Sequence, residues 1–485
     1  MKQYTVMFEP NKECVLVEHG TTLLQAEIKA GLHPDAPCGG KGTCGKCRVM
    51  VDGQELLACQ TVIERDMVVT LSQEKQANIL TAGLSTRINA DGNHNYVLAF
   101  DIGTTTMVAY LLEGRTGAVL ANASAINPQT QYGADVISRI QFALEGGADA
   151  LQNCIRNAVE QLTRDVKQRA GISEEEIGVA AIVGNTAMHH LLLGIDPKPL
   201  VTPPYMPNVY EAIELDAEGL LSIHGKIRVL PNIAGFVGGD TVGCMVATRF
   251  DTLDKLTLMI DIGTNGEMVL GNRQRRIACS TAAGPAFEGA KISCGMRGAV
   301  GAVDHVWLEN GEVKYHVIGE GAAAGLCGSG LLDLVAVLLD LEIIDESGYL
   351  KGSSYRLCEA VTLTQKDIRE VQLAKAAIRA GIELLAQNLG VATDQIQKVL
   401  LAGAFGNYMT PASACRIGMI PSELEACITS IGNAAGEGAK LCAVSEKEFS
   451  HSQMLAKNTD FLELASMPEF QDCYVDALEF GEEKE

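Results

Sequence analysis

Residues 98–106 read Leu98-Ala99-Phe100-Asp101-Ile102-Gly103-Thr104-Thr105-Thr106, and the pattern returns 160 residues later as Leu258-Met259-Ile260-Asp261-Ile262-Gly263-Thr264-Asn265-Gly266. Each copy is an apolar run, then Asp-Ile-Gly-Thr, then a second apolar run. This pattern predicts a strand, a tight turn and a returning strand. Because the flanking apolar residues repeat together with the tetrapeptide, we expect two related subdomains that face each other.

The two turns carry residues suited to phosphate binding. Glycine has no Cβ, so a phosphate can approach the backbone N–H groups closely, and hydroxyl side chains add further donors. The residues expected to contact phosphate are Gly103, Thr104, Thr105, Gly263, Thr264 and Asn265. Asp101 and Asp261 would sit at the strand ends beside these turns, where they can hold Mg2+ through water. The two turns therefore predict one phosphate site built by both subdomains.

A third glycine-rich segment comes late in the chain. Residues 398–406 read as a buried strand closed by the turn Gly403-Ala404-Phe405-Gly406. Such a turn would place bare backbone and an aromatic ring beside a flat adenine. Residues 150–170 and 366–389 alternate apolar and charged residues at helical spacing. Strands mixed with helices of this length predict an α/β fold.

The first part of the chain predicts a separate, strand-rich domain. Residues 4–8 and 14–17 have the pattern of a hairpin, and residues 22–30 that of a short amphipathic helix. Further strands are expected near residues 48–51 and 67–71. The polar residues that follow the last of these strands indicate a linker.

Four cysteines of this first domain predict the ligands of an iron–sulfur cluster; they are Cys38, Cys44, Cys47 and Cys59. Glycines between Cys38 and Cys47 let the backbone curl and turn its N–H groups toward the sulfides. A loop cysteine, a Cys-x2-Cys pair and a distant fourth cysteine form the plant-type 2Fe–2S pattern, with a first gap here of five residues instead of four. Zinc is the alternative, but zinc ligands usually come as two close pairs and Cys59 has no close partner.

The composition disfavours several classes of function. With 38 basic and 60 acidic residues, the formal net charge of −22 disfavours nucleic acid and anionic membranes as partners. No apolar run reaches the roughly 20 residues that cross a bilayer, and the polar start is unlike a signal peptide. Beyond the four ligands, eleven cysteines are scattered singly, as small buried residues are in a reducing cytoplasm. We expect a cytoplasmic protein with an acidic C-terminal tail.

The motifs together resemble the ATPase superfamily shared by actin, Hsp70 and sugar kinases. The similar segments are Asp101–Thr106 for the first phosphate motif, Asp261–Gly266 for the second, Leu401–Gly406 for the adenosine motif and Ile182–Met188 for the first connecting segment. A plant-type ferredoxin domain fused to this ATPase resembles the reductive activators of corrinoid proteins. Two further segments are similar to the ATPase half of that family, Ala282–Gly289 and Gly325–Leu331.

The resemblance implies a fold class and a domain organisation. The expected fold is an α+β ferredoxin-like (β-grasp) domain followed by an α/β, duplicated RNase H-like ATPase domain. The expected boundaries are 1–75 for the 2Fe–2S ferredoxin domain, 76–95 for the linker, 96–255 for ATPase subdomain I and 256–485 for subdomain II with the acidic tail.

The resemblance also implies a function. The chain would use ATP to pass one electron from the 2Fe–2S cluster to the Co(II) of a corrinoid protein, regenerating Co(I) for methyl transfer. The implied cofactors are the cluster, ATP and Mg2+. The implied partners are the corrinoid protein of a methyltransferase system and an upstream reductant such as a ferredoxin or a flavoprotein, and the chain would form a homodimer through its ATPase half. The expected catalytic residues are Asp101, Asp261 and Asp240.

Three other functions stay open on the sequence alone. In a small-molecule kinase, Asp240 would deprotonate an acceptor hydroxyl, although it reads more simply as a turn residue or a carboxylate in the Mg2+ shell. In the activator of a radical dehydratase, the ATPase itself would hold the cluster. The candidate ligands for that cluster are Cys279, Cys294 and Cys327, which read more simply as buried small residues. A redox sensor that binds a partner without turnover is the third.

Overall fold

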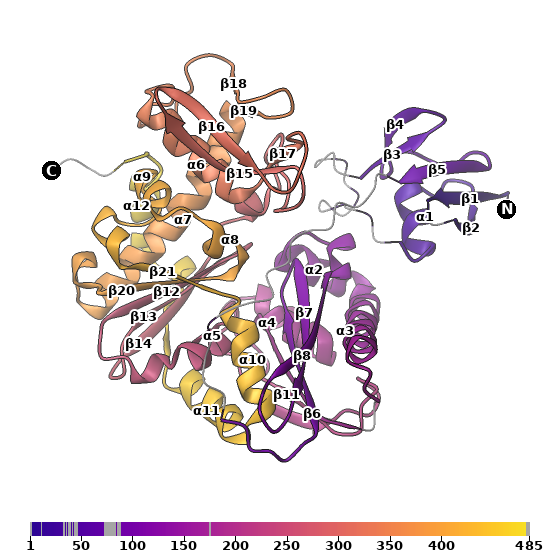
Figure 1. The fold of residues 1–485 in the computed structure, drawn as a ribbon, viewed down its shortest axis with the longest axis horizontal. Helices are drawn as coiled ribbons and strands as arrows, with labels where there is room; N and C mark the ends of the chain where they lie inside the picture. The colour runs from indigo at the N-terminus through magenta and orange to yellow at the C-terminus, as the bar shows by residue number, and fades with distance from the viewer. Residues whose placement is uncertain are drawn as a thin grey trace.

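The structure, a computed structural model, describes residues 2–481 except 11, 33, 35, 37–39, 41, 43–46, 72–83, 85–88 and 174–175 (Figure 1). Its N-terminal domain is a five-stranded sheet with one helix. The strands are β1 (Gln3–Glu9), β2 (Glu13–Glu18), β3 (Arg48–Val51), β4 (Gln54–Leu57) and β5 (Met67–Leu71), in the order β2-β1-β5-β3-β4. β1 and β5 run parallel, and the other neighbours are antiparallel.

The single helix of this domain, α1 (Leu23–Lys29), supplies the centre of its core. Thr22 caps the helix by accepting the N–H of Gln25, and the side chain of Gln25 accepts the N–H of Thr22 in return. Leu23 and Ala26 are fully buried, and they join apolar residues of the sheet in one cluster. The predicted α+β, β-grasp fold of the N-terminal domain is confirmed, and β4 is a strand that the sequence pattern did not reveal.

Two six-stranded sheets organise the rest of the molecule, and they repeat one pattern. The first sheet holds β6 (Tyr96–Ile102), β7 (Thr106–Glu113), β8 (Val119–Ile126), β9 (Ile177–Gly184), β10 (Ile213–Asp216) and β11 (Lys226–Val229). The second holds β12 (Thr257–Ile262), β13 (Gly266–Gly271), β14 (Arg276–Thr281), β20 (Lys398–Ala402), β21 (Ile428–Gly432) and β22 (Asp460–Phe461). The shared order is β8-β7-β6-β9-β11 in one sheet and β14-β13-β12-β20-β21 in the other, which confirms the predicted duplication.

Within each sheet the first three strands form an antiparallel meander, and the later two run parallel to its first strand. The carboxyl ends of β6, β9, β12 and β20 therefore meet at the edges of the two sheets that face each other. The two Asp-x-Gly-Thr turns join β6 to β7 and β12 to β13, as the sequence predicted. This topology brings both turns to one cavity between the subdomains.

Helices cover both sheets. They are α2 (Val136–Phe142), α3 (Ala148–Ala170), α4 (Thr186–Leu193), α5 (Gly239–Thr248), α6 (Gly328–Asp340), α7 (Gln365–Leu389), α8 (Gly403–Tyr408), α9 (Pro411–Arg416), α10 (Ala434–Val444), α11 (Glu446–Lys457) and α12 (Pro468–Asp476). α3 packs on β7 and β8, and α7 packs on β13 and β14. Both are the long helices that the sequence predicted. Among the described residues, no helix combines the length and the apolar character needed to cross a membrane.

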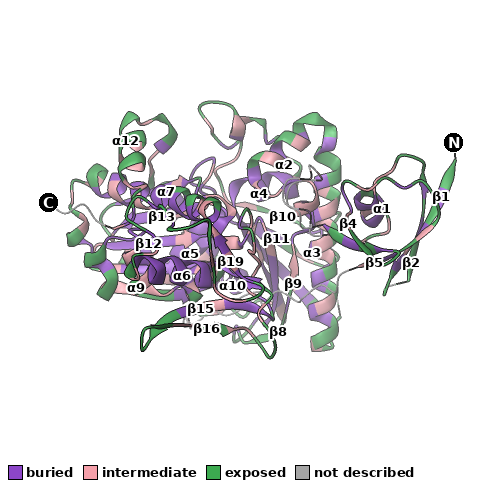
Figure 2. Cartoon of the chain, turned by 90° about the horizontal axis from the view of Figure 1, so that it is seen from above, coloured by how far each residue is buried: buried purple, intermediate pink, exposed green. Residues whose placement is uncertain are grey.

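Two small sheets complete the second subdomain. They are β16 (Glu312–Val317), β15 (Ala302–Glu309) and β17 (Gly325–Leu326) in one, and β18 (Ser354–Arg356) with β19 (Thr362–Thr364) in the other. α6 packs beneath β15 and is almost wholly buried, as is α5 (Figure 2). The three-stranded sheet forms one wall of the cleft described below.

α5 and α10 lie together between the two large sheets. α10 packs on β6 and β9 of the first sheet, although it follows the last long strand of the second. The two helices approach so closely that a Cβ on Gly438 would lie 2.1 Å from the carbonyl oxygen of Gly243. Their apolar side chains form one cluster with residues of both sheets, among them Val97 and Met259. The two subdomains therefore share a core at the floor of the cleft.

The C-terminal segment is anchored in the second subdomain. Phe480 is 2% exposed and belongs to the core cluster of that subdomain. Lys375 of α7 donates from Nζ to the carbonyl of Glu479 and lies over the ring of Phe480, while Gln372 donates to the carbonyl of Leu478 over 2.8 Å. Burial lowers the pKa of Lys375 to about 7. The acidic tail is thus held by an aromatic anchor as far as residue 481.

Replacing Phe480 with alanine should destabilise the protein. Removing a buried phenyl ring costs about 3–5 kcal/mol when the surroundings do not collapse into the space, so we expect a loss of about 3 kcal/mol in the free energy of unfolding. Urea denaturation followed by circular dichroism measures this loss. Val475→Ala is the matched control, because Val475 lies in the same segment and is 52% exposed; a loss below about 1 kcal/mol for Phe480→Ala would show that the segment is not anchored.

Candidate functional site

Hydrogen bonds from neighbouring segments fix the shape of the first hairpin, which joins β6 to β7. The N–H of Gly103 donates to the carbonyl of Thr106 over 2.9 Å, and a Cβ on Gly103 would lie only 2.9 Å from that same oxygen. Arg139 of α2, which is fully buried, donates from Nη2 to the carbonyl of Thr104 over 2.5 Å. Asn185 donates from Nδ2 to the hydroxyl of Thr104 over 2.8 Å. A buried cation and an amide thus fix the turn.

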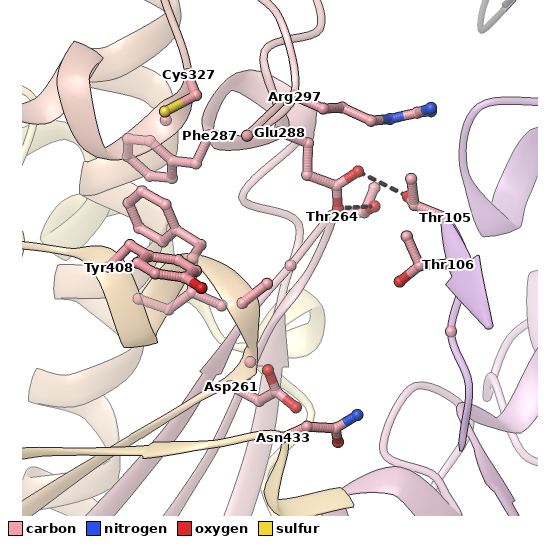
Figure 3. Close-up of a pocket in the computed structure, with 18 of the residues that line it drawn as sticks. Thr105, Thr106, Asp261, Thr264, Phe287, Glu288, Arg297, Cys327, Tyr408 and Asn433 are labelled. Carbon is pink, nitrogen blue, oxygen red and sulfur yellow. Dashed lines mark hydrogen bonds between the residues drawn. The ribbon is translucent and has the colours of Figure 1, made fainter. Parts of the chain in front are cut away.

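The second hairpin is built in the same way from β12 and β13. The N–H of Gly263 donates to the carbonyl of Asn265 over 2.9 Å. The hydroxyl of Thr264 donates to Oε1 of Glu288 over 2.7 Å, and the hydroxyl of Thr105 from the first hairpin donates to Oε2 of the same carboxylate, also over 2.7 Å. Figure 3 shows this carboxylate between the two threonines. The two turns therefore converge on one point of the cleft.

Four carboxyl groups line the floor of the cleft: Asp101, Asp240, Asp261 and Glu267. Asn433, the N-cap of α10, donates to Oδ2 of Asp101 over 2.8 Å. Asp240 lies in the first turn of α5 and accepts the N–H of Thr241 over 2.7 Å. Asp261 is the penultimate residue of β12, opposite Glu267 of β13. An acidic floor of this kind suits a divalent cation and its water shell.

Burial raises the pKa of each of these acids, and repulsion by neighbouring acids adds to the effect at Asp101, Asp261 and Glu267. The pKa of Asp101 is raised to about 7 by burial first and then by Asp240, against the hydrogen bond from Asn433. The pKa of Asp261 is likewise raised to about 7, by burial and then by Asp240 and Asp101. Burial raises the pKa of Asp240 to about 6 and that of Glu267 well above its usual range. A cation bound here would relieve this repulsion.

The part of the cavity where the base is expected to bind is lined by glycine and aromatic residues. Gly403 has φ +80°, and a Cβ there would lie 2.5 Å from Oδ1 of Asp261. The rings of Phe405 and Phe287 stack with centroids 4.7 Å apart and planes 11° from parallel. A Cβ on Gly328 would lie 2.0 Å from the carbonyl of Phe287, so the N-terminus of α6 closes against these rings. Bare backbone beside aromatic faces is the surface that a purine requires.

These parts line a single cavity of about 450 Å3, a size suited to a nucleotide. The predicted residues that line it are Asp101, Gly103, Thr104, Thr105, Asp240, Asp261, Gly263, Thr264, Asn265, Gly403, Ala404 and Phe405. Gly406 is not among the lining residues: a Cβ there would lie 3.1 Å from Cβ of Leu401, so it serves close packing behind the site. The glycine-rich turn itself differs from expectation, because Gly403–Tyr408 forms the helix α8.

The sequence pattern missed several residues of the cavity: Glu267, Glu288, Arg297 and Asn433. Arg297 extends over the phosphate end of the cleft, above Thr105 (Figure 3), and no ion pair joins it to any carboxylate in the part of the chain that the structure describes. Asn433 had a detectable signal, because an asparagine between a strand and a helix is a common N-cap. Glu288 and Arg297 had none, because their position depends on how the two subdomains meet.

Two of the four predicted cluster ligands lie in the described part of the N-terminal domain. Cys47 and Cys59 are 4% and 7% exposed, and the N–H of Ala58 donates to the carbonyl of Cys47 over 2.7 Å. Gly40 has φ +82°, and a Cβ on it would lie 3.9 Å from Cβ of Cys59, so this glycine lies beside this cysteine. Cys38 and Cys44 lie outside the described residues. The placement of the other two fits a cluster held at the edge of the domain core.

The alternative cluster ligands do not come together. Cys279 is fully buried in β14, Cys294 directs its sulfur to the carbonyl of Thr362, and Cys327 directs its sulfur to the carbonyl of Val303. Within the ranges that the structure describes, no three histidine, cysteine or acidic side chains form a metal-binding group. The four acids that line the cavity do not form such a group in the described part of the chain either.

The raised pKa values predict an unusual pH dependence of stability. Between about pH 4 and pH 7 the folded protein holds protons on Asp101 and Asp261 that the unfolded chain has released, so the free energy of unfolding falls as pH rises through this window. Asp261→Asn removes one of the repelling charges. Without Mg2+ we expect this variant to be more stable than the wild type at pH 8, by about 1–2 kcal/mol, and equally stable at pH 4. Thermal or urea unfolding at both pH values measures the difference, and equal stability at pH 8 would contradict the prediction.

The fold and the cavity define the class of protein: a ferredoxin-type domain joined to a two-lobed ATPase fold of the actin, Hsp70 and sugar kinase type. Residues 7–68 match the family described as the 2Fe-2S iron-sulfur cluster binding domain. Residues 96–253 match the RACo middle region, and residues 255–485 match the C-terminal domain of RACo, the ASKHA domain. The predicted fold class is confirmed for both halves.

Relatives identify the family. The chain is 37% identical over 420 residues to the corrinoid activation enzyme RamQ of Eubacterium limosum, covering 80% of this chain and 70% of that protein. It is 26% identical over 424 residues to the [Co(II) methylated amine-specific corrinoid protein] reductase of Methanosarcina barkeri, covering 79% and 77%. A solved reductive activator for corrinoid, iron-sulfur protein is similar with a TM-score of 0.72 at 29% identity, covering 98% of each chain. This chain belongs to the family of reductive activators of corrinoid proteins.

Proposed function

We propose that this chain uses ATP to transfer one electron from its 2Fe–2S cluster to the Co(II) of a corrinoid protein, which restores the Co(I) form for methyl transfer. The observation that carries the proposal is the joining, in one chain, of a cluster-binding domain to a cavity in which two phosphate hairpins and an acidic floor face each other. The printed names of the relatives, which describe corrinoid activation and Co(II) reduction, support the same reaction.

Energetics explain why an electron donor needs an ATPase. A plant-type cluster has a potential of about −400 mV, and we expect the Co(II)/Co(I) couple of the partner to lie lower, so spontaneous transfer is unfavourable. A ligand shifts such a balance only through a difference in its affinity for two states. The two lobes around the cavity can supply these two states, one open and one closed on a nucleotide. Closure can then favour one arrangement of the bound corrinoid partner.

The cavity suggests a role for each part. The hydroxyls of Thr105 and Thr264 would bind phosphate oxygens, and Gly103 and Gly263, which lack a Cβ, would let the phosphate approach the turns closely. Asp101, Asp240 and Asp261 would hold hydrated Mg2+, and Phe405 with the backbone at Gly403 would contact the adenine. Arg297 would neutralise phosphate charge from above. The cluster, held by the four cysteines of the first domain, supplies one-electron transfer.

The remaining features of the proposal follow from the family. The macromolecular partner is the corrinoid protein of a methyltransferase system, and the upstream reductant is a ferredoxin or a flavoprotein. We propose a homodimer formed through the ATPase half and a cytoplasmic location. A small-molecule kinase would also use Asp240, but it has no use for the 2Fe–2S domain that residues 7–68 match.

The test is the ATP dependence of cobalt reduction. The cluster-loaded chain is mixed anaerobically with an excess of a chemical reductant and a Co(II) corrinoid protein, with Mg-ATP, with Mg-ADP or without nucleotide. The account predicts a Co(I) absorption band only with Mg-ATP, and ATP hydrolysis that increases when the Co(II) protein is added. Equal Co(I) formation without nucleotide, or hydrolysis that instead requires a small acceptor molecule, would contradict the proposal.

A further inference from the structure

Glu288 connects the two phosphate hairpins across the cleft. Its Oε2 accepts the hydroxyl of Thr105 over 2.7 Å and its Oε1 accepts the hydroxyl of Thr264 over 2.7 Å. Thr105 belongs to the first subdomain, whereas Thr264 and Glu288 belong to the second. One half-buried carboxylate therefore uses both oxygens to tie the two lobes together at the point where their turns converge (Figure 3).

This bridge and a bound phosphate exclude each other. A threonine hydroxyl has a single proton to donate, and both hydroxyl protons are directed at Glu288. A phosphate oxygen is an acceptor, so it can use these donors only after the carboxylate has released them. The carboxylate would also repel a phosphate at hydrogen-bonding distance from the same threonines. Any phosphate that binds to both hairpins must therefore displace Glu288.

The segment that carries Glu288 also reaches the base-binding part of the cleft. Glu288 ends the short helix η6 (Pro285–Glu288), and the residue before it, Phe287, stacks on Phe405 of α8. Gly284 and Gly289 flank η6 with φ +78° and +75°, a backbone region that glycine adopts without strain. η6 packs on α6 and α7. A shift of Glu288 would therefore also move Phe287 against Phe405 and change the packing of η6 on α6 and α7.

We infer that Glu288 is a positioning residue that makes the arrangement of the two lobes depend on the nucleotide: it bridges Thr105 and Thr264 until phosphate oxygens take both hydroxyls, and its release moves η6. Glu288 thus acts as an internal competitor of the nucleotide and lowers its affinity. The inference rests on the proposed function, because it takes this cavity to be the ATP site.

Titration calorimetry of the full chain with the Mg complex of a non-hydrolysable ATP analogue tests the inference. Glu288→Ala should bind the analogue about fivefold more tightly than the wild type, since a competing hydrogen bond of ordinary strength is lost. Glu288→Gln removes the charge and leaves a single accepting oxygen, because the amide nitrogen can only donate, so its affinity should fall between the two. Glu309→Gln is the matched control, because Glu309 is an exposed residue of β15 in the same subdomain, and it should bind like the wild type.

Repeating the Glu288→Ala substitution in a Thr105→Val protein distinguishes competition for the Thr105 hydroxyl from a general change in the site. In Thr105→Val the contested hydroxyl of the first hairpin is absent, so the gain from Glu288→Ala should shrink to about twofold or less. Circular dichroism of each variant verifies folding, and Glu288→Gln carries the test if the alanine variant does not fold.

The outcomes separate the two claims. If the wild type does not bind the analogue, the cavity is not the ATP site and the proposed function fails together with this inference. If the wild type binds but Glu288→Ala is within twofold of it, or weaker, the cavity remains the ATP site while Glu288 is not a competitor of the nucleotide. An undiminished gain in the Thr105→Val background would also overturn the inference.

Discussion

Replacing Cys47 with alanine should remove the 2Fe–2S cluster and all ATP-dependent reduction of a corrinoid partner. Cys47 is the second cysteine of the Cys-x2-Cys pair and is 4% exposed at the edge of the domain core. Three thiolates cannot complete the coordination of a cluster that needs four. We expect iron content and the visible absorption of the cluster to fall to background, while binding of ATP to the second half of the chain persists. Iron analysis, visible spectra and nucleotide titration measure these three properties.

The same domain offers a matched control for this variant. Cys14 lies on β2, is exposed and is outside the predicted ligand set. Cys14→Ala should therefore retain the cluster, the iron content and the reduction of Co(II). If Cys47→Ala keeps two irons per chain, the assignment of the ligands is wrong, and if it loses the cluster but still reduces cobalt, the electron takes another route.

Replacing Asp261 with asparagine should also abolish reduction of the corrinoid partner, because it impairs the ATPase half of the molecule. Asp261 is the penultimate residue of β12 in the second hairpin, and a Cβ on Gly403 would come within 2.5 Å of its carboxylate. Asparagine keeps the size of the side chain but removes the charge that would hold hydrated Mg2+. Loss of one such electrostatic contact commonly lowers turnover by about 10²–10³-fold, and we expect that loss in ATP hydrolysis and in Co(I) formation, with the cluster intact.

Asp261→Asn should lose activity while it gains stability, which distinguishes a lost ligand contact from misfolding. The same variant should be more stable than the wild type at pH 8 without Mg2+, because it relieves repulsion among buried acids. Asp254→Asn is the matched control: Asp254 lies seven positions before Asp261, has a side chain 74% exposed and pairs with Arg273, so both activity and stability should be nearly unchanged. Full ATPase activity in Asp261→Asn would remove this residue from the nucleotide site.

Local patterns carried most of the fold and much of the site. The alternation of apolar runs with Asp-Ile-Gly-Thr predicted both hairpins, because the strands and turns that they form depend on neighbouring residues. The parallel placement of β9 and β20 beside them follows the family topology. Once the two sheets face each other, Asp101, Thr105, Asp261 and Thr264 must meet, and the structure brings them to one cavity. Their roles as nucleotide ligands remain predictions.

The features that the sequence did not reveal depend on contacts between distant segments. Glu288 reaches Thr105 across 183 positions of the chain, and Asn433 reaches Asp101 across 332. α10 returns to pack on the first sheet although it lies deep in the second half of the sequence. Phe480 is buried although it lies in the acidic C-terminal tail. No local pattern marks the distant partners of such residues, because these contacts are created by the tertiary fold.

A single-turnover experiment tests whether the cluster passes its electron to Co(II) only in the presence of ATP. The cluster of the chain is reduced, excess reductant is removed, and the protein is mixed anaerobically with one equivalent of a Co(II) corrinoid protein, with Mg-ATP or with Mg-ADP. Electron paramagnetic resonance follows the reduced cluster and Co(II), and absorbance follows Co(I). The account predicts that cluster oxidation and Co(I) formation occur together, one for one, with Mg-ATP and not with Mg-ADP. Equal transfer with both nucleotides, or Co(I) formed while the cluster stays reduced, would contradict it.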